Sequence, residues 1–570
     1  MTKINANTDR DRDPKLEPES ETLANVSSAS ANYREDASVK DPTCSKKVRL
    51  GQYYTSPRVA NFIVSLAETA TSGKVIEAGY GRGAFFEALL KAGYADISGY
   101  DIDPENYAFV QERFASQINP YCQSFLEASG EPTCDLVIGN PPYVRWGNID
   151  AETRQFLLED KFWAKYSSGE WDLLYAFIIW SIKMLKEGGE LIFIVPYNWF
   201  SSTHAAPLRQ YLVDHGHFKE IIHFNEYKVF DDASPNTIIF RFLKKPAAAA
   251  KIRVVELNST DLESSQVIAG AGNCLSELAC GREVNNDDWQ AFEMEQFKSA
   301  APWYLANSAE TKIISTIEAK ANQQLGELAR VGVGVVSGYD RAFIVDDSFY
   351  AQLSGPERAL VHRFVKARHC QRFKVDQPAW FIWADSIEAE TDLRKLPRLH
   401  EHLFAHKDSL LARYGADPDL WWHWATVRNL PLFESSLNAP KIFVPCADRA
   451  ETARFSITDK AYFGSGDVLL IAARGGNNPY YLQAWLGSDV FNRWYRIKGP
   501  QTGRRTRYTQ SFIASVPVLA ETAFSSADRD HLVGNIKLLM NSTDPSEKER
   551  LIAENDGIFA GVFPALSSAP

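Results

Sequence analysis

The residues best suited to chemistry lie in the stretch Asn140-Pro141-Pro142-Tyr143. Asn140 offers a side-chain carbonyl and Pro141 a backbone carbonyl, so two acceptors on adjacent residues can hold a planar –NH2 group. Tyr143 offers the face of an aromatic ring to a flat partner. The stretch therefore indicates a pocket for an amide or an amino-substituted base. The alternative is a Pro-Pro turn at a strand end with an exposed tyrosine.

A short buried strand must position these residues. Residues 135–139 read Asp-Leu-Val-Ile-Gly, and the two prolines that follow stop the strand because proline donates no ladder hydrogen bond. Ligands of open α/β sheets bind outside the carboxyl ends of the strands. We therefore expect Asn140 and Tyr143 to lie at such a strand end.

A second stretch predicts a nucleoside cofactor. Residues 74–86 begin as a short strand, enter a turn with Gly79, Gly81 and Gly83, and continue as a helix. Glycines let the backbone approach a ligand closely. Asp101 ends a second strand about 20 residues later, where an acid can bind ribose hydroxyls. No phosphate-binding lysine follows the glycines, which excludes a P-loop, and a purely structural strand–helix–strand unit is the alternative.

The segment before this turn predicts a helix start. Residues 51–57 read Gly-Gln-Tyr-Tyr-Thr-Ser-Pro, and apolar residues then recur at helical spacing. Ser56 is placed to cap this helix and Pro57 to occupy its first position.

Composition and charge limit the class of protein. With 570 residues, 45% of them hydrophobic, the chain has room for two or three globular domains. A net charge of −11 argues against a protein that binds nucleic acid non-specifically through its overall charge. A local basic cleft remains compatible with this net charge, because salt screens distant charges. Seven scattered cysteines without a Cys-x-x-Cys pair predict neither a disulfide framework nor a metal site. No apolar run suits a signal peptide or a bilayer span, so we expect a cytoplasmic protein with no membrane partner.

The α/β pattern continues to about residue 246. Residues 173–180 predict a helix that is buried on most sides, and residues 191–196 predict an interior strand. Residues 218–224 and 237–242 predict two strands that close the sheet. The Lys-Lys-Pro sequence at 244–246 and the alanines after it predict a domain boundary.

The remainder of the chain is less regular. A helix is expected over residues 311–328, and its Glu318-Ala319-Lys320 triplet is interpreted as a solvated face because no partner acid precedes it on a strand. With no convincing nuclease motif, any restriction activity would need a separate partner protein. Short strands bounded by glycine and proline, which predict a mixed α+β domain, are expected at 341–345, 380–383, 441–445 and 467–471.

Two parts of this region have residues suited to nucleic acid. The tryptophans at 421, 422 and 424 are interpreted as core packing in preference to nucleic-acid contact. The stretch 493–508 carries Arg, Lys, Gln and Thr around a glycine loop, residue types that contact phosphates and base edges. The predicted contact residues are Lys498, Arg504, Arg505 and Arg507.

Taken together, these motifs resemble those of the TaqI-type adenine-specific DNA methyltransferases. The resemblance is close over residues 49–245 and looser over 325–520. It implies an α/β fold, with a Rossmann-like S-adenosylmethionine-dependent methyltransferase domain followed by an α+β target-recognition domain. The expected divisions are a disordered leader at 1–47, a catalytic domain at 48–246, a connector at 247–310, a DNA target-recognition domain at 311–520, and a C-terminal helix and tail at 521–570.

The resemblance also assigns roles to individual residues. The implied catalytic residues are Asn140, Pro141, Pro142 and Tyr143, with Phe230 on the far face of the target base. The implied cofactor residues are Thr55 at the methionine part, Glu77, Gly79 and Gly81 in the glycine-rich motif, Asp101 at the ribose, Ile102, Phe125 and Phe177 at the adenine, and Asn140. Ser124 stands where the family usually has aspartate, so its contact with the cofactor's amino group is weaker.

The function implied is methyl transfer from S-adenosylmethionine to the N6 amine of an adenine flipped out of double-stranded DNA. The protein would be the modification component of a restriction–modification system, with a cognate restriction endonuclease as partner. The open alternatives are a methyltransferase for RNA or for a protein glutamine, and a non-enzymatic DNA-binding specificity subunit. The long segment that follows the catalytic motifs favours an enzyme that recognises nucleic acid over one that methylates a protein glutamine.

Overall fold

The computed structural model describes residues 51–166, 171–230, 236–247, 249–413, 416–425, 429–502 and 505–566. The leader predicted at 1–47 and Arg504 lie outside these residues.

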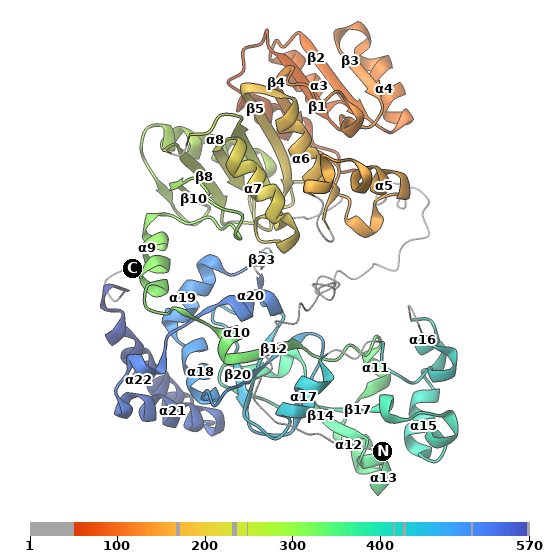
Figure 1. Ribbon diagram of the computed structural model, residues 1–570, viewed down its shortest axis with the longest axis vertical. Coiled ribbons are helices and arrows are strands. Elements are labelled where there is room, and N and C mark those ends of the chain that lie inside the picture. The colour runs from red at the N-terminus through yellow and green to blue at the C-terminus, as the bar shows by residue number, and fades with distance from the viewer. Residues whose placement is uncertain are drawn as a thin grey trace, which may run out of the picture. The chain divides into compact units, whose positions relative to one another are not determined.

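A mixed sheet organises the described residues up to 295. Its ten strands follow the order β3-β2-β1-β4-β5-β7-β6-β8-β10-β9 (Figure 1). β1 pairs in parallel with β2 on one side and with β4 on the other, so the strand order reverses beside β1. Such a reversal opens a crevice at the carboxyl ends of the two central strands. The strands are β1 (Lys74–Ala78), β2 (Asp96–Asp101), β3 (Asn119–Cys122), β4 (Cys134–Gly139), β5 (Leu185–Pro196), β6 (His217–His223), β7 (Thr237–Leu243), β8 (Lys251–Leu257), β9 (Val284–Asn285) and β10 (Trp289–Glu295).

Helices cover both faces of this sheet, as the buried strand sequences require. Ile76 and Val137 pack into a core with α6 and α7, whereas Val75 and Leu136 pack into a second core with α2, α3 and α8. Adjacent residues point to opposite faces because side chains alternate along a strand. The helix predicted to be buried is α6, and ten of its residues are buried. The helices here are α2 (Pro57–Ser65), α3 (Ala84–Lys91), α4 (Pro104–Phe114), α5 (Ala151–Glu159), α6 (Leu173–Met184), α7 (Ala206–His215) and α8 (Ser264–Ala279).

The sheet extends beyond the two strands predicted to close it. Residues 217–223 and 237–243 form β6 and β7 as expected, but both are interior strands, so that prediction of closure is wrong. β8 pairs in parallel with β6, and β10 then pairs antiparallel with β8. Residues 247–310, expected to be a connector, therefore contribute three strands to the sheet.

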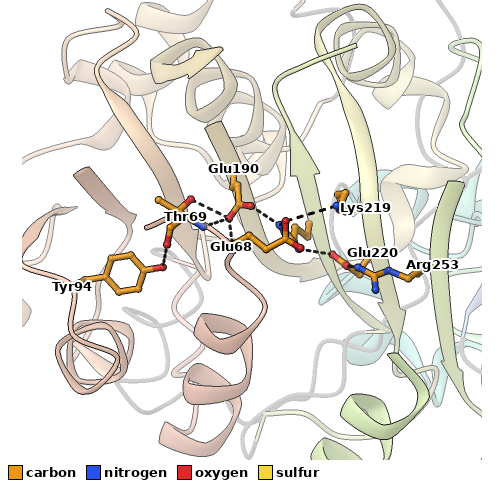
Figure 2. A network of polar contacts seen from close by, with 8 residues as sticks. Glu68, Thr69, Tyr94, Glu190, Lys219, Glu220 and Arg253 are labelled. Atoms are coloured by element: carbon orange, nitrogen blue, oxygen red, sulfur yellow. Dashed lines mark hydrogen bonds and ion pairs between the residues drawn. The ribbon is translucent and has the colours of Figure 1, made fainter. Parts of the chain in front are cut away.

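A partly buried ion network joins these later strands to the loop before β1 (Figure 2). Arg241 in β7 has 2% of its side chain exposed, and its Nη2 lies 2.5 Å from Glu190 Oε1 in β5 and 2.9 Å from Glu68 Oε2. Its Nη1 lies 3.5 Å from Glu220 Oε2 in β6, and Glu220 also pairs with Arg253 in β8. Each carboxylate therefore meets a cation, the condition under which charges are tolerated in a protein interior.

The described residues from 308 onward form smaller sheets around two further hydrophobic cores. Four-stranded sheets have the orders β12-β22-β18-β20 and β13-β17-β14-β21, and a third sheet has the order β19-β24-β23. The main strands are β12 (Ala329–Val333), β13 (Ile344–Val345), β14 (Val361–Val365), β17 (Ala379–Ile382), β18 (Lys441–Pro445), β19 (Ala447–Asp448), β20 (Ser456–Thr458), β21 (Tyr462–Gly464), β22 (Val468–Ala473), β23 (Gln501–Thr502) and β24 (Arg505–Arg507). The longer helices are α9 (Ser308–Glu318), α15 (Pro397–Phe404), α17 (Leu430–Ser436), α18 (Pro479–Leu486), α19 (Asp489–Lys498), α21 (Ser526–Asn541) and α22 (Pro545–Val562).

Two elements predicted for this region, the helix at 311–328 and the strand at 341–345, differ in the structure. The helix expected over 311–328 ends at Glu318, since a short strand and the one-turn helix α10 (Leu325–Leu328) follow it. The strand expected at 341–345 is mostly the helix α11 (Asp340–Phe343). The three tryptophans interpreted as core packing are buried, which confirms that interpretation. None of the described helices has the length and apolarity needed to cross a bilayer.

Candidate active site

The glycine turn after β1 and the Asn-Pro-Pro-Tyr motif after β4 lie against each other. A Cβ atom added to Gly79, whose φ is +83°, would lie 3.6 Å from the Asn140 carbonyl oxygen and 3.9 Å from the Pro141 Cα. The turn is held to β2 by a hydrogen bond from Gly79 N to the Tyr100 carbonyl, at 2.9 Å. Both motifs therefore share the crevice where the strand order reverses.

The Asn140 carboxamide is held in one orientation. Its Nδ2 donates to the Tyr53 carbonyl at 2.7 Å and to Thr55 Oγ1 at 3.1 Å. A carbonyl oxygen can only accept, so the nitrogen must face Tyr53 and the Oδ1 must face the other way. On that side the Tyr143 hydroxyl donates to Asn140 Oδ1 at 2.5 Å. The side chain thus presents an acceptor oxygen whose direction is set by three neighbours.

Three aromatic rings gather at the motif. The Tyr53 ring is stacked on the Tyr143 ring, with centroids 5.1 Å apart and an interplanar angle of 28°. Phe230, which is 3% exposed, meets Tyr143 edge-on, with centroids 6.3 Å apart at 65°. In this structure Tyr53 is therefore the ring that faces Tyr143. Sequence reasoning did not single out Tyr53, although it stands two residues before the predicted Thr55.

Burial and hydrogen bonding keep the Tyr143 hydroxyl protonated. Its oxygen also lies 2.9 Å from the Ile194 carbonyl in β5. Burial raises the pKa of Tyr143 well above its usual range, and the nearby Tyr53 and Asp172 add to that shift. The hydroxyl is consequently protonated at neutral pH, and both of its neighbours, Asn140 Oδ1 and the Ile194 carbonyl, are acceptors for its one hydrogen.

The segment 51–56 is fastened to the motif at several points. Gly51 has a φ of +60°, and a Cβ there would lie 2.7 Å from Tyr143 N, so only glycine fits. Tyr143 N donates to the Gly51 carbonyl at 3.3 Å, and Gln52 Nε2 donates to Asp103 at 3.1 Å. Ser56 caps α2 as predicted, because its side chain accepts from Val59 N.

Asp101 shapes the glycine turn. Its Oδ2 accepts from Gly81 N at 2.8 Å and from Asn106 Nδ2 at 3.2 Å, while its Oδ1 accepts from Asp103 N at 2.8 Å. Burial raises the pKa of Asp101, although these hydrogen bonds oppose the shift. One lone pair of Oδ1 remains for a ligand, since each carboxylate oxygen accepts two hydrogen bonds. Asn106 and Asp103 support this turn and were not anticipated from sequence.

Glu77 offers the clearest sign of a missing partner. It is 1% exposed, and its Oε2 has no hydrogen-bond partner among the described residues. Burial raises the pKa of Glu77, and the charge of Asp101 adds to the rise. Buried polar atoms are normally bonded, so this oxygen fits a donor or cationic group of a ligand. Ile102 is 55% exposed beside Asp101, which suits an apolar wall for a flat ring.

Aromatic residues predicted for a cofactor's adenine lie together. Phe125 and Phe177 are 2% and 7% exposed, with ring centroids 5.3 Å apart. The Ser124 hydroxyl oxygen accepts from Leu126 N at 3.3 Å, so one of its lone pairs caps a local turn. Tyr121 is 44% exposed and stacks on Tyr100, and it is a further aromatic residue that sequence reasoning missed.

Of the residues predicted to contact nucleic acid, Lys498 lies at a helix end and Arg505 and Arg507 lie in a strand. Lys498, in the last turn of α19, pairs with Glu318 at 2.7 Å, so the face expected to be fully solvated carries an ion pair. Arg505 and Arg507 lie in β24, which pairs antiparallel with β23, and the residues between these two strands lie outside the described residues. Arg505 is exposed and Arg507 is half-buried. The described residues include no group of three or more His, Cys, Asp or Glu arranged to hold a metal ion.

Comparison with known proteins agrees with this geometry. Residues 89–230 match the family of Eco57I restriction-modification methylases. The type II methyltransferase M.HindII of Haemophilus influenzae is 30% identical over 488 residues, which cover 83% of this chain and 90% of that protein. M.HincII, also from Haemophilus influenzae, is 28% identical over 482 residues, covering 83% of this chain and 89% of that protein.

The predicted fold class is confirmed by a solved structure. The type IIL restriction-modification enzyme MmeI, determined in complex with DNA, superposes with a TM-score of 0.57 over 89% of this chain and 72% of that one, at 13% identity. At this identity the likeness shows the fold alone. The sequence relationship to M.HindII along nearly its whole length shows the family: this chain belongs to the type II methyltransferases and is a DNA methyltransferase of the restriction–modification type.

Proposed function

We propose that the protein transfers the methyl group of S-adenosylmethionine to the N6 amine of an adenine flipped out of double-stranded DNA. The observation that carries this proposal is the Asn140 carboxamide, fixed by Tyr53 and Thr55 so that its Oδ1 points away from them, beside Gly79 of the glycine turn. An oriented acceptor next to a nucleoside-binding turn suits an amino group that must meet a methyl donor.

Asn140 and Pro141 would activate the amine by favouring a pyramidal geometry at its nitrogen. The lone pair of an adenine amine is conjugated into the ring, which makes the nitrogen a weak nucleophile. Hydrogen bonds from the –NH2 group to Asn140 Oδ1 and the Pro141 carbonyl favour a pyramidal nitrogen and free that lone pair. As the new N–C bond forms, the S–C bond of the donor breaks, and the amine then gives up one proton to solvent. Positioning supplies most of the rate gain.

Tyr143 and Phe230 would hold the extruded base. Flipping a base out of the duplex costs a few kcal/mol. Stacking on an aromatic ring returns roughly 1–3 kcal/mol per base, and Tyr143 offers such a face. Phe230 lies edge-on to Tyr143 in this structure, so it fits the side of the base better than its second face.

The cofactor site follows from the residues around β1 and β2. When bound, S-adenosylmethionine supplies an activated methyl group. Glu77 Oε2, for which no described residue is a hydrogen-bond partner, suits the cationic amino acid part, and Asp101 has acceptor capacity left for a ribose hydroxyl. We propose Ile102, Phe125 and Phe177 for the adenine ring and Thr55 for the methionine part, as the family resemblance implies. A hydrogen bond from the cofactor's amino group to the Ser124 hydroxyl would be weaker than one to the aspartate that the family usually has.

Double-stranded DNA is the proposed partner. MmeI and DrdV, which share the fold at TM-scores of 0.57 and 0.51, were both determined as complexes with DNA. We propose that residues 311–520 form the target-recognition domain, with Lys498, Arg504, Arg505 and Arg507 contacting DNA. A separate cognate endonuclease would complete the restriction–modification system.

The test is product identification. The purified protein is incubated with methyl-labelled S-adenosylmethionine and, separately, DNA, RNA or a release factor, and labelled nucleosides or peptides are identified by mass spectrometry. We expect label only in DNA, as N6-methyladenine, and none with Asn140→Ala. Label in N4-methylcytosine, in RNA or in a glutamine would refute the assignment, as would undiminished transfer by Asn140→Ala that still binds cofactor.

A further inference from the structure

Arg145 is a cation beside the candidate active site, and no described residue forms an ion pair with it. It stands two residues after Tyr143, so the Cα atoms of the two residues are at most about 7 Å apart. Arg145 is exposed, whereas Val144 between them is buried. Within the described part of the chain, the Arg145 guanidinium also makes no hydrogen bond.

Other arginines of this domain are engaged with protein groups. Arg154 donates to three backbone carbonyls of residues 146–149, at 2.7, 3.1 and 3.4 Å. Arg209 donates to three backbone carbonyls as well, and Arg241 pairs with three carboxylates. These side chains stabilise the fold. Arg145 differs from them because its donors and its charge remain available to a ligand.

The main chain on both sides of Arg145 is held in place. The Val144 carbonyl accepts from Leu173 N at 2.9 Å, which ties this segment to the start of α6. The Arg145 carbonyl accepts from Asn148 N at 2.8 Å. The Cα atom from which the arginine side chain extends is therefore fixed beside Tyr143.

Asp172, at the start of α6, links the charge of Arg145 to the aromatic pocket. Burial raises the pKa of Asp172 to about 7, and the positive charge of Arg145 opposes that rise. Asp172 in turn contributes to the raised pKa of Tyr143, after burial and Tyr53. The charge of Arg145 is therefore felt at the acid that borders the Tyr143 ring. A carboxyl with a pKa near 7 is about half protonated at neutral pH, so Asp172 does not neutralise Arg145.

A phosphate of DNA is the ligand that suits this exposed guanidinium. The planar fork of arginine matches two phosphate oxygens at once. The chain has a net charge of −11, so its overall field repels DNA, and nearby cations must hold the backbone where salt screens distant charges. A base that is extruded onto Tyr143 stays attached to the phosphates on either side of it, and these must come to the edge of the pocket.

We propose that Arg145 binds a phosphate that flanks the extruded nucleotide, and so holds the target strand while the base stacks on Tyr143. This inference rests on the proposed function, because it takes an extruded base in DNA as the substrate. Arg145 is a positioning residue, since it contacts the backbone and not the reacting amine. It contributes affinity and register without reading the sequence.

The salt dependence of DNA binding tests the contact. Each phosphate contact adds about 0.9 to the slope of log affinity against log salt concentration. Arg145→Gln should therefore reduce the magnitude of this slope by about 0.9, measured by fluorescence anisotropy of a target duplex with the full chain. Arg145→Lys keeps the charge and should keep the slope. As a matched control, Arg282→Gln removes an exposed arginine that pairs with Glu277, and it should leave the slope unchanged.

Neutral methylphosphonates, placed one at a time along the target strand, locate the contact. The target adenine is first identified by sequencing methylated DNA. Replacing a phosphate that flanks this adenine should weaken binding by the wild type, whereas the same replacement should have little further effect on Arg145→Gln. Equal losses in the two proteins at both flanking positions would overturn the assignment, as would an unchanged slope in Arg145→Gln with a wild-type unfolding midpoint. A wild-type protein that makes no N6-methyladenine would instead refute the proposed function on which the assignment rests.

Discussion

Replacing Asn140 by aspartate tests the role of the amide nitrogen separately from that of the amide oxygen. The aspartate keeps the Oδ1 acceptor but replaces the Nδ2 donor by a second acceptor oxygen. That oxygen would face the Tyr53 carbonyl, which lies 2.7 Å from Nδ2, and the Thr55 hydroxyl at 3.1 Å. The variant therefore loses the hydrogen bond to Tyr53 and sets two oxygens with partial negative charge against each other.

The magnitude follows from these contacts. A neutral hydrogen bond contributes about 0.5–1.5 kcal/mol net, and a buried group left without its partner costs about 1–3 kcal/mol. Together they disfavour the productive orientation by about 2–4 kcal/mol. At about 1.36 kcal/mol per tenfold, Asn140→Asp should lower kcat roughly 30- to 1000-fold at neutral pH. Cofactor affinity should change less than kcat, because Asn140 is only one of the proposed cofactor contacts and the glycine turn is untouched.

The pH dependence gives the sharper test. A protonated aspartate has an O–H that can donate to the Tyr53 carbonyl, so protonation restores the lost hydrogen bond. The ratio of variant to wild-type kcat should therefore rise as pH falls toward the carboxyl pKa, measured by methyl transfer between pH 8 and pH 5. A flat ratio, or near wild-type kcat at neutral pH, would refute the role assigned to the Asn140 nitrogen.

Three further predictions concern other parts of the catalytic domain. Asp101→Ala should raise the cofactor's dissociation constant in a calorimetric titration, because the Gly81 amide loses its acceptor; unchanged affinity would contradict the role of this turn. Arg241→Met should lower the free energy of unfolding by about 3–5 kcal/mol in a urea titration, since Glu190 and Glu220 stay buried without their shared cation, and a loss below 1 kcal/mol would count against the network. Burial raises the pKa of Asp172 to about 7, so its neutral form is favoured on folding, and the stability it contributes is complete below pH 4 and is lost as pH rises through about 7. Asp172→Asn should consequently raise the unfolding midpoint at pH 8 but not at pH 4, and an equal shift at both would show that charge is not the cause.

Local sequence was sufficient for the elements that carry the motifs. Glycines at 79, 81 and 83 and prolines at 141 and 142 mark where β1 and β4 end, because these residue types have strong backbone preferences. Parallel strands then bring their carboxyl ends to one edge of the sheet. These preferences predict the crevice, whereas the role of Thr55 is implied by the family resemblance.

Contacts between residues that are distant in the sequence could not be predicted from it. Tyr53 and Asn140 are 87 positions apart, and nothing in a Gly-Gln-Tyr-Tyr-Thr sequence says which tyrosine lies on Tyr143. Similarly, the Lys-Lys-Pro sequence at 244–246 has the composition of a boundary, yet the chain turns there and pairs β8 with β6. Such pairings depend on hydrogen bonds and packing between strands rather than on the preferences of the residues themselves.

The parallel pairing of β6 with β8 has a practical consequence for isolating the catalytic half. A chain shortened to end at residue 246 would keep every motif residue but leave β6 without its outer neighbour, over the register from Glu220 to His223. Unpaired N–H and C=O groups on a long apolar edge strand recruit other chains. Such a fragment would be expected to self-associate during expression, whereas one extended past Glu295 would retain the natural covering of that edge.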